Sequence, residues 1–204
     1  MTRWATLAIA LVFSAIATVQ YSGIASGQSG GGWVTLFDGK NLDQWQGDGT
    51  ATFKIEDGSV IATDKKDPKA TAAYLLTKQS YKDFELRAEF WVSDDANSGI
   101  FIRNTDPAKI SSKAGYEVNI FDTRPDPSYG TGAIVDTAKA ATVLKAGGKW
   151  NTYEIVAKGP KMTVTLNGTK TVDGVEDAKF SAGPIALQFG VGTVKFRKVE
   201  IKTL

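Results

Sequence analysis

The chain has 204 residues, of which 42% are hydrophobic and 10% aromatic, and its formal net charge is +2. This composition is typical of a globular protein with a substantial core, and the near-neutral charge gives no indication of nucleic-acid binding. The sequence contains no Cys and no His. Disulfides, thiolate metal sites, Cys nucleophiles and His general bases are therefore excluded. Any chemistry must come from Asp, Glu, Lys, Arg, Tyr, Ser or Thr.

The first 27 residues have the layout of a cleavable secretory signal peptide. Met1–Arg3 gives a short positive start, and Trp4–Val19 is almost entirely apolar. Either Ala15-Ile16-Ala17 or Ala25-Ser26-Gly27 fits the small-residue pattern that a signal peptidase accepts. A membrane anchor is the alternative, because the apolar run approaches the lower length limit of a spanning helix. The short run and the small residues favour cleavage, so we expect a periplasmic or secreted protein without stable membrane insertion. Residues 28–32 follow as a flexible spacer.

Residues 33–204 are expected to form one all-β domain. Phe84–Val92 is the clearest segment, because apolar residues at even positions alternate with polar residues and Trp91 at odd positions. Similar segments are Gly99–Arg103, Tyr116–Phe121, Tyr153–Ala157, Met162–Leu166, Ile185–Phe189 and Val194–Ile201. The pairs Asp57-Gly58 and Asn167-Gly168 predict type I′ hairpin turns, and only Ala138–Leu144 shows a weak helical period. Many short antiparallel strands predict a sandwich or jelly roll of two sheets.

Strand alternation also sorts the side chains that do not face the core. These side chains are Glu85, Arg87, Glu89 and Trp91 on the first strand, Phe101 and Arg103 on the next, Glu117 and Asn119 on the third, and Gln188 near the C-terminus. If the strands are neighbours, one sheet face combines carboxylates, Arg, amides and aromatic rings. Sugars are bound by this mixture, because rings contact the apolar faces of a pyranose and planar polar groups bind its hydroxyls.

A solvated face with cross-strand ion pairs is the simpler interpretation of alternating Glu and Arg, and we prefer it for Glu85 and Arg87. Glu89, Arg103, Glu117 and Gln188 lie among aromatic or amide residues and near Gly-containing turns, where ligands approach closely. We therefore expect these four side chains to converge on one concave sheet face. Trp45 and Trp150 follow turn-rich stretches and are expected to be core or lid anchors.

Seven short motifs, in order, cover nearly all of the expected mature chain. They are Trp33–Leu42 with Trp45, Tyr81–Leu86, Asn97–Arg103, Gly115–Val118 with Asp122, Trp150–Ile155, Gly183–Gln188 and Val194–Arg197. In these motifs the chain resembles the 3-keto-disaccharide hydrolase family, whose domain is also described as a 3-keto-glucoside 1,2-lyase and a 3-keto-2-hydroxy-glucal hydratase. The resemblance implies a concanavalin A-like jelly roll that acts on sugars already oxidised at carbon 3.

One stretch departs from the family pattern. Many relatives carry Asp-His-Gly after Leu-Gln, whereas Leu187–Thr193 contains no His. If that His is a ligand or proton carrier in the relatives, this chain uses a carboxylate instead or has kept only binding.

The implied chemistry needs a base, a group that stabilises an oxyanion, and an acid. Glu89 or Glu117 is the candidate base, Arg103 the candidate cation for the enolate, and Asp122, Tyr116 or the other Glu the candidate acid. Candidate substrate-binding residues are Trp91, Asn97, Phe101, Asn119, Gln188 and Arg197. The sequence assigns no cofactor but leaves a divalent metal open, which carboxylates and Gln188 would hold in a site of hard oxygen ligands.

The sequence thus predicts an exported carbohydrate-active protein that binds an oxidised 3-keto sugar or glycoside. The expected reaction is elimination of the carbon 1 substituent followed by hydration, which amounts to hydrolysis. A non-catalytic carbohydrate-binding β-sandwich is the main alternative, because one fold hosts many functions. A structural envelope protein is a third interpretation. An ordinary two-carboxylate glycosidase is less favoured, because we find no close Glu-x-Asp-x-x-Glu motif of the kind such jelly-roll enzymes carry.

Overall fold

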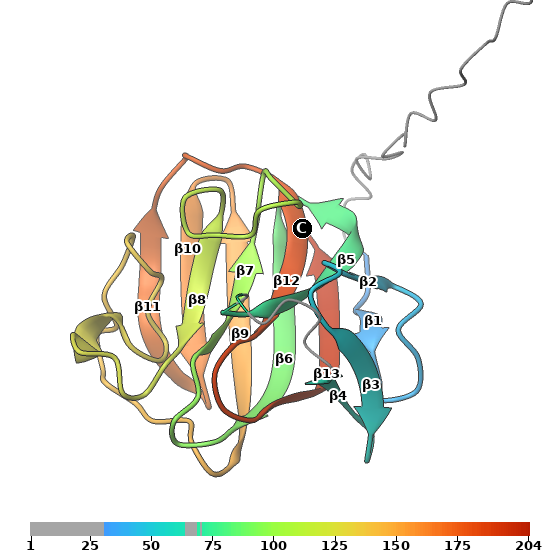
Figure 1. The fold of residues 1–204 in the computed structure, drawn as a ribbon. Helices are drawn as coiled ribbons and strands as arrows, with labels where there is room; N and C mark the ends of the chain where they lie inside the picture. Colours follow the sequence, from blue (N-terminus) through green and yellow to red (C-terminus); the bar gives the residue numbers. More distant parts are fainter. Residues whose placement is uncertain (1–30, 64–68, 70) are drawn as a thin grey trace, which may run out of the picture.

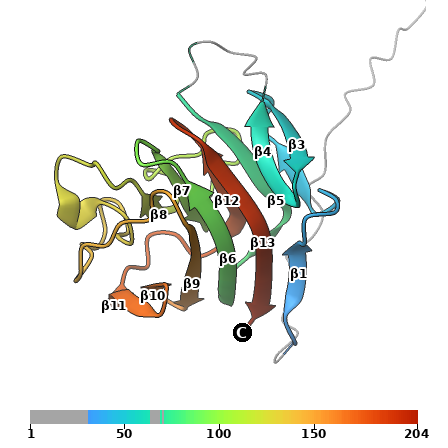
Figure 2. The same ribbon diagram turned by 90° about the horizontal axis from the view of Figure 1, so that it is seen from below.

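Two antiparallel β-sheets pack face to face in the computed structural model, which describes residues 31–63, 69 and 71–204 (Figures 1 and 2). The predicted signal peptide, residues 1–27, lies outside the described residues. The strands are β1 (Val34–Phe37), β2 (Trp45–Gly47), β3 (Thr52–Glu56), β4 (Ser59–Thr63), β5 (Ala73–Tyr81), β6 (Phe84–Val92), β7 (Ser98–Ile102), β8 (Tyr116–Ile120), β9 (Trp150–Lys158), β10 (Lys161–Leu166), β11 (Thr169–Glu176), β12 (Gly183–Phe189) and β13 (Val194–Thr203). One 3-10 turn, η1 (Pro127–Tyr129), follows β8.

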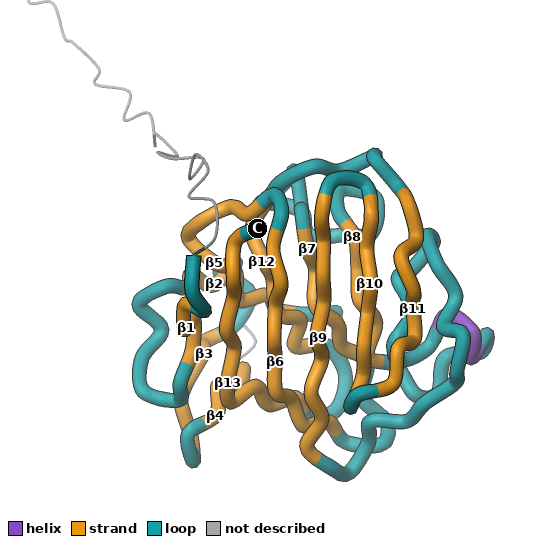
Figure 3. Tube along the Cα trace, turned by 180° about the vertical axis from the view of Figure 1, so that it is seen from behind, coloured by secondary structure: helices purple, strands orange, loops and turns teal. Residues whose placement is uncertain are grey.

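The two sheets differ in size. The larger sheet has eight strands in the order β11-β10-β9-β6-β13-β4-β3, with β1 paired to β13 at its side. The smaller sheet has five strands in the order β2-β5-β12-β7-β8. Figure 3 shows β13, β6, β9 and β10 of the larger sheet side by side. Because β6 and β8 belong to different sheets, the side chains that point outward from them lie on opposite surfaces of the sandwich.

The alternation of β6 explains how the sandwich closes. Its even-numbered residues from Phe84 to Val92 are all buried, whereas the odd-numbered ones are partly exposed. The buried side joins one continuous core with the inner faces of β7, β8 and β12. Within this core the ring of Phe90 stacks on that of Tyr153, with 5.0 Å between their centroids. This packing confirms the expected all-β sandwich of the concanavalin A-like jelly-roll type.

The hairpin predictions are also confirmed. Asp57 and Gly58 have φ values of 49° and 70°, and Asn167 and Gly168 have 50° and 79°. Both central residues of a type I′ turn require such positive values, which Asn, Asp and Gly tolerate best. The weak helical prediction is wrong, because Ala138–Leu144 forms no helix. Ala138 there forms backbone hydrogen bonds with Ile134. In the described part of the chain, no helix is long and apolar enough to cross a membrane.

Candidate functional site

A row of side chains crosses the outer surface of the smaller sheet. Successive cross-strand partners in this row are Gln46, Leu76, Ala186, Phe101 and Glu117, from β2 through β5, β12 and β7 to β8. The adjacent row pairs Tyr74 with Gln188, and Gly99 with Asn119. We call the surface formed by Tyr74, Leu76, Phe101, Glu117 and Gln188 the Glu117 face. Its polar and aromatic groups therefore come from four neighbouring strands.

The floor of the Glu117 face is apolar and is separate from the sandwich core. Leu76, Phe101 and Ala186 are buried and form their own cluster, against which Tyr74 and Ile110 pack. The rings of Tyr74 and Phe101 meet edge to face at 5.6 Å. An apolar floor with aromatic rings and a few polar groups is the usual make-up of a small-molecule site.

Glu117 is the carboxylate of this face. It is half-buried, and burial raises its pKa to about 7, with the negative charge of Asp136 adding to the rise and the positive charge of Arg124 opposing it. Within the described residues, its carboxylate makes no hydrogen bond or ion pair. Gly99 leaves room for it, because a Cβ at position 99 would stand 3.2 Å from Glu117 Oε1. A carboxylate with a pKa near neutrality is suited to act as a general base.

Gln188 and Tyr74 supply the hydrogen-bonding groups beside Glu117. Gln188 Nε2 donates to the Tyr74 hydroxyl at 3.2 Å, and burial raises the pKa of Tyr74, so this hydroxyl stays protonated at neutral pH. Gln188 Oε1 and Asn119 Oδ1 are the buried side-chain atoms without a hydrogen-bond partner in the part of the chain described. Unpartnered buried polar atoms are costly in a folded protein, which indicates that a ligand or ordered water completes them.

Two loops flank the Glu117 face: the first joins β7 to β8, and the second joins β8 to β9. They meet at Asp136, which belongs to the second loop. Its carboxylate accepts hydrogen bonds from Lys113 Nζ at 3.0 Å and from Ser112 Oγ at 3.3 Å. Arg124 lies in the second loop, half-buried, and its charge favours the ionised form of Glu117. Sequence analysis did not select Arg124, although its position shortly after the Tyr116–Phe121 motif was a usable signal. Arg124 rather than Arg103 is the cation near the carboxylate.

Glu89 lies on the opposite surface of the molecule, so the expectation of one face for all four residues is wrong. Glu89 accepts a hydrogen bond from Arg197 Nε at 2.6 Å, and the Arg197 guanidinium lies over the Trp150 ring at 4.1 Å. Only Glu117 and Gln188 of the expected set share a face. The cause is topological: β6 belongs to the larger sheet and β8 to the smaller one.

The outer surface of the larger sheet is largely a solvated ion-pair surface. Arg87 pairs with Glu154 at 3.5 Å and Lys202 with Glu85 at 3.6 Å. This confirms the interpretation of Glu85 and Arg87 as members of a solvated face. Trp91 also lies here, with Lys195 Nζ 5.7 Å from its ring centroid. Trp91 and Arg197 are therefore not part of the Glu117 face.

Arg103 is buried and joins the β5–β6 turn to the β9–β10 turn. The expectation that it binds the enolate is therefore wrong. Its side chain is 1% exposed. It donates to the carbonyls of Lys82 at 2.8 Å and Gly159 at 2.7 Å, and it forms an ion pair with Asp83 at 3.0 Å. Its φ of 53° departs from the strand conformation, so the alternation that places Phe101 outward does not extend to Arg103.

The candidate acids away from Glu117 have structural partners. Asp122 accepts hydrogen bonds from the Thr131 hydroxyl and from the backbone N–H groups of Ala146 and Gly147, which fixes the long loop after β8. Tyr116 is buried in the core, where its hydroxyl donates to Asp177 at 2.7 Å. Neither group is placed to reach a substrate on the Glu117 face.

The remaining predicted residues divide between the face and its surroundings. Phe101 lies on the Glu117 face, and Asn119 lies beside it, where its Nδ2 donates to the Tyr129 carbonyl at 2.7 Å. Asn97 lies in the turn before β7, paired through its backbone with Val191. Trp45 is a core anchor whose Nε1 donates to the Leu36 carbonyl, but Trp150 is 36% exposed and anchors nothing in the core.

The backbone of Leu187–Thr193 explains why this stretch has no His at position 190. A Cβ at Gly190 would stand 2.2 Å from the carbonyl oxygen of Asn97, so this backbone path excludes any side chain at that position. As for metals, no three Asp or Glu side chains come close enough to hold an ion anywhere in residues 31–63, 69 and 71–204. The Glu117 face offers one carboxylate and the amide oxygens of Asn119 and Gln188.

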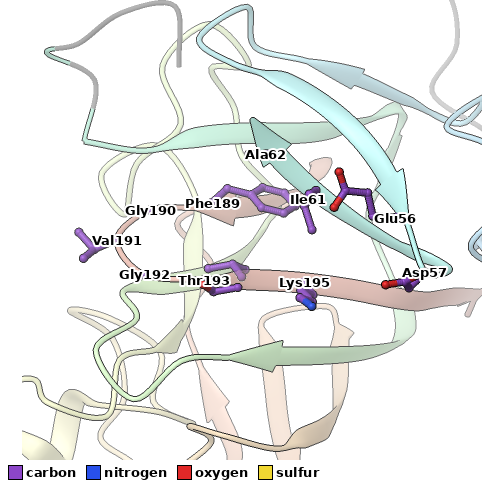
Figure 4. A pocket seen from close by; sticks show the side chains of 11 residues that line it. Glu56, Asp57, Ile61, Ala62, Phe189, Gly190, Val191, Gly192, Thr193 and Lys195 are labelled. Carbon is purple, nitrogen blue, oxygen red and sulfur yellow. The ribbon is translucent and has the colours of Figure 1, made fainter. Parts of the chain in front are cut away.

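A cleft lies elsewhere in the molecule, between the β3–β4 hairpin and the β12–β13 loop (Figure 4). Its volume is about 580 Å³, and its lining includes Glu56, Ile61, Phe189, Thr193 and Lys195. None of the residues of the Glu117 face lines it. We place the candidate chemistry at Glu117, because burial raises the pKa of this carboxyl to about 7.

Comparisons with known proteins give a family match and a match to one curated protein. The model of the 3-keto-alpha-glucoside-1,2-lyase-like domain matches residues 32–202. A 3-keto-disaccharide hydrolase of Bacteroides thetaiotaomicron is 29% identical in an alignment 152 residues long, which covers 61% of this chain and 52% of that protein. The match thus spans about half the length of that curated relative.

Two solved structures of candidate glycosyl hydrolases from Parabacteroides distasonis share the fold. One has a TM-score of 0.67 and 26% identity, covering 85% of this chain and 100% of that one. The other has a TM-score of 0.73 and 18% identity, covering 85% and 94%. The matched proteins are thus named for reactions on carbohydrates.

Proposed function

Because this chain belongs to the family of 3-keto-alpha-glucoside-1,2-lyase-like domains, we propose that it is an enzyme that cleaves 3-keto-glucosides by elimination and hydration. The net reaction is hydrolysis of the bond between carbon 1 and the leaving group. The family match and the curated relative named a 3-keto-disaccharide hydrolase support the reaction type. The observation that carries the proposal on this chain is the unpartnered, half-buried Glu117 carboxylate on an apolar and aromatic floor.

Glu117 is the proposed base of the elimination step. A ketone at carbon 3 acidifies the proton on carbon 2, because its loss gives a delocalised enolate. Glu117 takes this proton, the electron pair forms the double bond between carbons 1 and 2, and the bond from carbon 1 to the leaving oxygen breaks. The proton on Glu117 then passes to the leaving oxygen, which is close because it is attached to the neighbouring carbon. The products are an alcohol and an unsaturated 2-hydroxy-3-keto-glucal.

Tyr74 and Gln188 are proposed to bind the carbon 3 oxygen while it carries negative charge. The Tyr74 hydroxyl is protonated at neutral pH and already contacts the Gln188 amide. Hydrogen-bond donors fixed in place before the reaction stabilise a developing oxyanion without a cost of reorganisation. Arg124, in the flanking loop, adds positive charge to the same region.

Hydration completes the reaction. Water adds its hydroxyl to carbon 1 and a proton to carbon 2, which removes the double bond between these carbons and gives a free 3-keto sugar. Glu117 can serve both steps, because a carboxyl with a pKa of about 7 is present in both protonation states near neutrality.

The test uses the purified protein with a 3-keto-glucoside carrying a chromogenic leaving group, and with the unoxidised parent glucoside as the control. We expect cleavage of the ketone only, transient enone absorbance, and incorporation of solvent deuterium at carbon 2. Glu117→Gln should lower kcat by roughly 10²- to 10⁴-fold, the usual contribution of a general base. The matched control is Glu89→Gln, a carboxylate on the opposite sheet.

Two outcomes would contradict the proposal. Binding of the 3-keto-glucoside without turnover would identify a carbohydrate-binding module. Cleavage of the parent glucoside at a similar rate would identify a two-carboxylate glycosidase, since that mechanism needs no ketone.

We also infer that the protein is exported, from the positive start, the apolar run and the small residues of its first 27 positions. The expected mature chain begins between Thr18 and Gln28. N-terminal sequencing of secreted or periplasmic material tests this inference, and an intact Met1 in a membrane fraction would indicate an anchor.

A further inference from the structure

The 580 Å³ cleft is lined by no residue of the Glu117 face (Figure 4). It lies beside the loop that joins β12 to β13, whereas Glu117 lies on β8 at the far edge of the smaller sheet. Pockets of about 300–1,000 Å³ are typical of small-molecule sites, so a few sugar units would fit. The proposed reaction at Glu117 does not use this cleft.

The lining of the cleft combines groups that bind neutral hydroxyl compounds. Glu56 and Asp57 come from the β3–β4 hairpin and provide acceptors, and Lys195 on β13 provides a donor. Ile61 and Phe189 add apolar surface between them. Because opposite charges face the same cleft, a strongly charged ligand of either sign would meet repulsion, whereas the hydroxyls of a neutral sugar can bind both.

Lys195 also connects the cleft to a pair of aromatic rings. It is the cross-strand partner of Trp91, and its Nζ lies 5.7 Å from the centroid of the Trp91 ring. Trp91 is in turn the cross-strand partner of Trp150, which is 36% exposed. Two indole rings on neighbouring strands of the larger sheet therefore lie next to Lys195, and the Arg197 guanidinium covers one face of the Trp150 ring at 4.1 Å. Exposed indoles are typical contact groups for the apolar faces of ligands.

We propose that this cleft, together with Trp91 and Trp150, is a second carbohydrate-binding site that holds a neutral glycan chain. The site would retain the protein on a glycan while the Glu117 face acts on a released or terminal sugar. The proposal depends on the groups of the cleft and not on catalysis at Glu117, so either proposal can fail while the other stands.

A matched set of variants tests the site by affinity electrophoresis in native gels. The probes are laminarin and hydroxyethyl cellulose as neutral glucans, with polygalacturonate as an acidic glycan. Trp91→Ala removes a ring next to the cleft, and Lys195→Glu reverses the charge that links the cleft to this ring. The control is Trp33→Ala, because Trp33 is also 36% exposed and also carries a cation over its ring, Arg87 at 4.3 Å. Trp33 does not line the cleft.

We expect at least one neutral glucan to retard the unmodified protein and Glu117→Gln equally. Trp91→Ala and Lys195→Glu should each weaken this retardation by roughly fivefold or more, the loss expected for a ring contact of about 1 kcal/mol. Trp33→Ala should behave like the unmodified protein. Thermal unfolding of each variant shows whether it is folded. If Trp91→Ala does not fold, Lys195→Glu still tests the site.

Three results would overturn the proposal. The first is no retardation by either neutral glucan. The second is retardation that both cleft variants leave unchanged or that Trp33→Ala weakens equally. The third is stronger retardation by polygalacturonate than by the neutral glucans, which would show that the surface binds acidic polymers through its Lys and Arg side chains.

Discussion

Glu117 lies against Gly99 of the neighbouring strand, in space that only a residue without a side chain leaves open. A Cβ at position 99 would stand 3.2 Å from both Cγ and Oε1 of Glu117 and 3.1 Å from the carbonyl oxygen of Val118. These contacts are too close for an unshifted side chain. A displacement of a few tenths of an ångström in the Glu117 side chain would relieve two of them, and the third requires a similar shift in the backbone of β7 or β8. Gly99 therefore sets the position of the candidate base without contacting substrate itself.

Gly99→Ala should lower kcat while leaving the fold intact. The added methyl group pushes the Glu117 carboxylate away, and small misplacements of a reacting group are costly, so we expect a loss of roughly tenfold or more. The measurement is the kcat for the chromogenic 3-keto-glucoside, together with thermal unfolding. Because the role is one of positioning, KM should change less than kcat. An unchanged kcat in a folded variant would show that Glu117 is not held by this contact.

The pH dependence of the reaction should report the pKa of Glu117. As a base, Glu117 must be ionised, so kcat/KM should rise with pH through about 7 and level off above it. The rise should be absent from the residual activity of Glu117→Gln. A profile for the unmodified protein that stays flat between pH 5 and pH 9 would contradict the assignment of Glu117 as the base.

Protein stability should fall over the same pH range. The pKa of Glu117 is about 7 in the folded protein and near its ordinary value of 4.5 when unfolded, so the folded state binds more protons between these values. The free energy of unfolding therefore decreases as pH rises from 4.5 to 7, by up to about 3 kcal/mol from this group. Glu117→Gln removes this loss. Denaturant unfolding at pH 5 and pH 8 should show the variant gaining stability relative to the unmodified protein only at pH 8.

Strand alternation was sufficient to predict which residues share one side of a strand. It placed the buried and partly exposed residues of Phe84–Val92 correctly, because the period of two is set by the backbone itself. The turn pairs Asp57-Gly58 and Asn167-Gly168 were equally predictable, because positive φ values restrict the residue types. The all-β sandwich follows from these local rules.

Alternation does not show which of two sheets a strand joins. For that reason the prediction that Glu89 and Glu117 share one face was wrong. Glu89 and Glu117 both point away from the core, yet pairing between strands distant in sequence places them on opposite surfaces. Arg103 fails for a different reason. It follows the end of β7 with a positive φ, so its position cannot be derived from the parity of Phe101. Arg124 lies in an irregular loop, where no periodic pattern identifies the residues that face a site.

Glu89→Gln should leave the proposed activity unchanged within about twofold. Its carboxylate pairs with Arg197 on the outer surface of the larger sheet, and both side chains are partly exposed. Surface pairs of this kind contribute at most about 1 kcal/mol, so the variant should also stay folded. Steady-state kinetics on the 3-keto-glucoside provide the check. A loss of kcat as large as that of Glu117→Gln would return Glu89 to the active site.

Arg103 should be required for stability and dispensable for chemistry. Its guanidinium is buried, and it joins the β5–β6 turn to the β9–β10 turn through the carbonyls of Lys82 and Gly159. It also forms an ion pair with Asp83, whose carboxylate accepts a hydrogen bond from the backbone N–H of Gly159 at 2.8 Å. Arg103→Met leaves these acceptors without their donor, and we expect the free energy of unfolding to fall by about 3 kcal/mol or more.

Arg103→Lys keeps the charge but not the planar fork that reaches several acceptors at once, so it should recover only part of the loss. Denaturant unfolding gives the stabilities, and kinetics below the unfolding transition test the chemistry. If Arg103 only holds the turns together, the folded fraction of Arg103→Lys should show a normal kcat and an unchanged pH profile. Should kcat fall by more than about tenfold in a fully folded variant, the cation would be acting on the substrate after all, and the buried position of its side chain would need to change during the reaction.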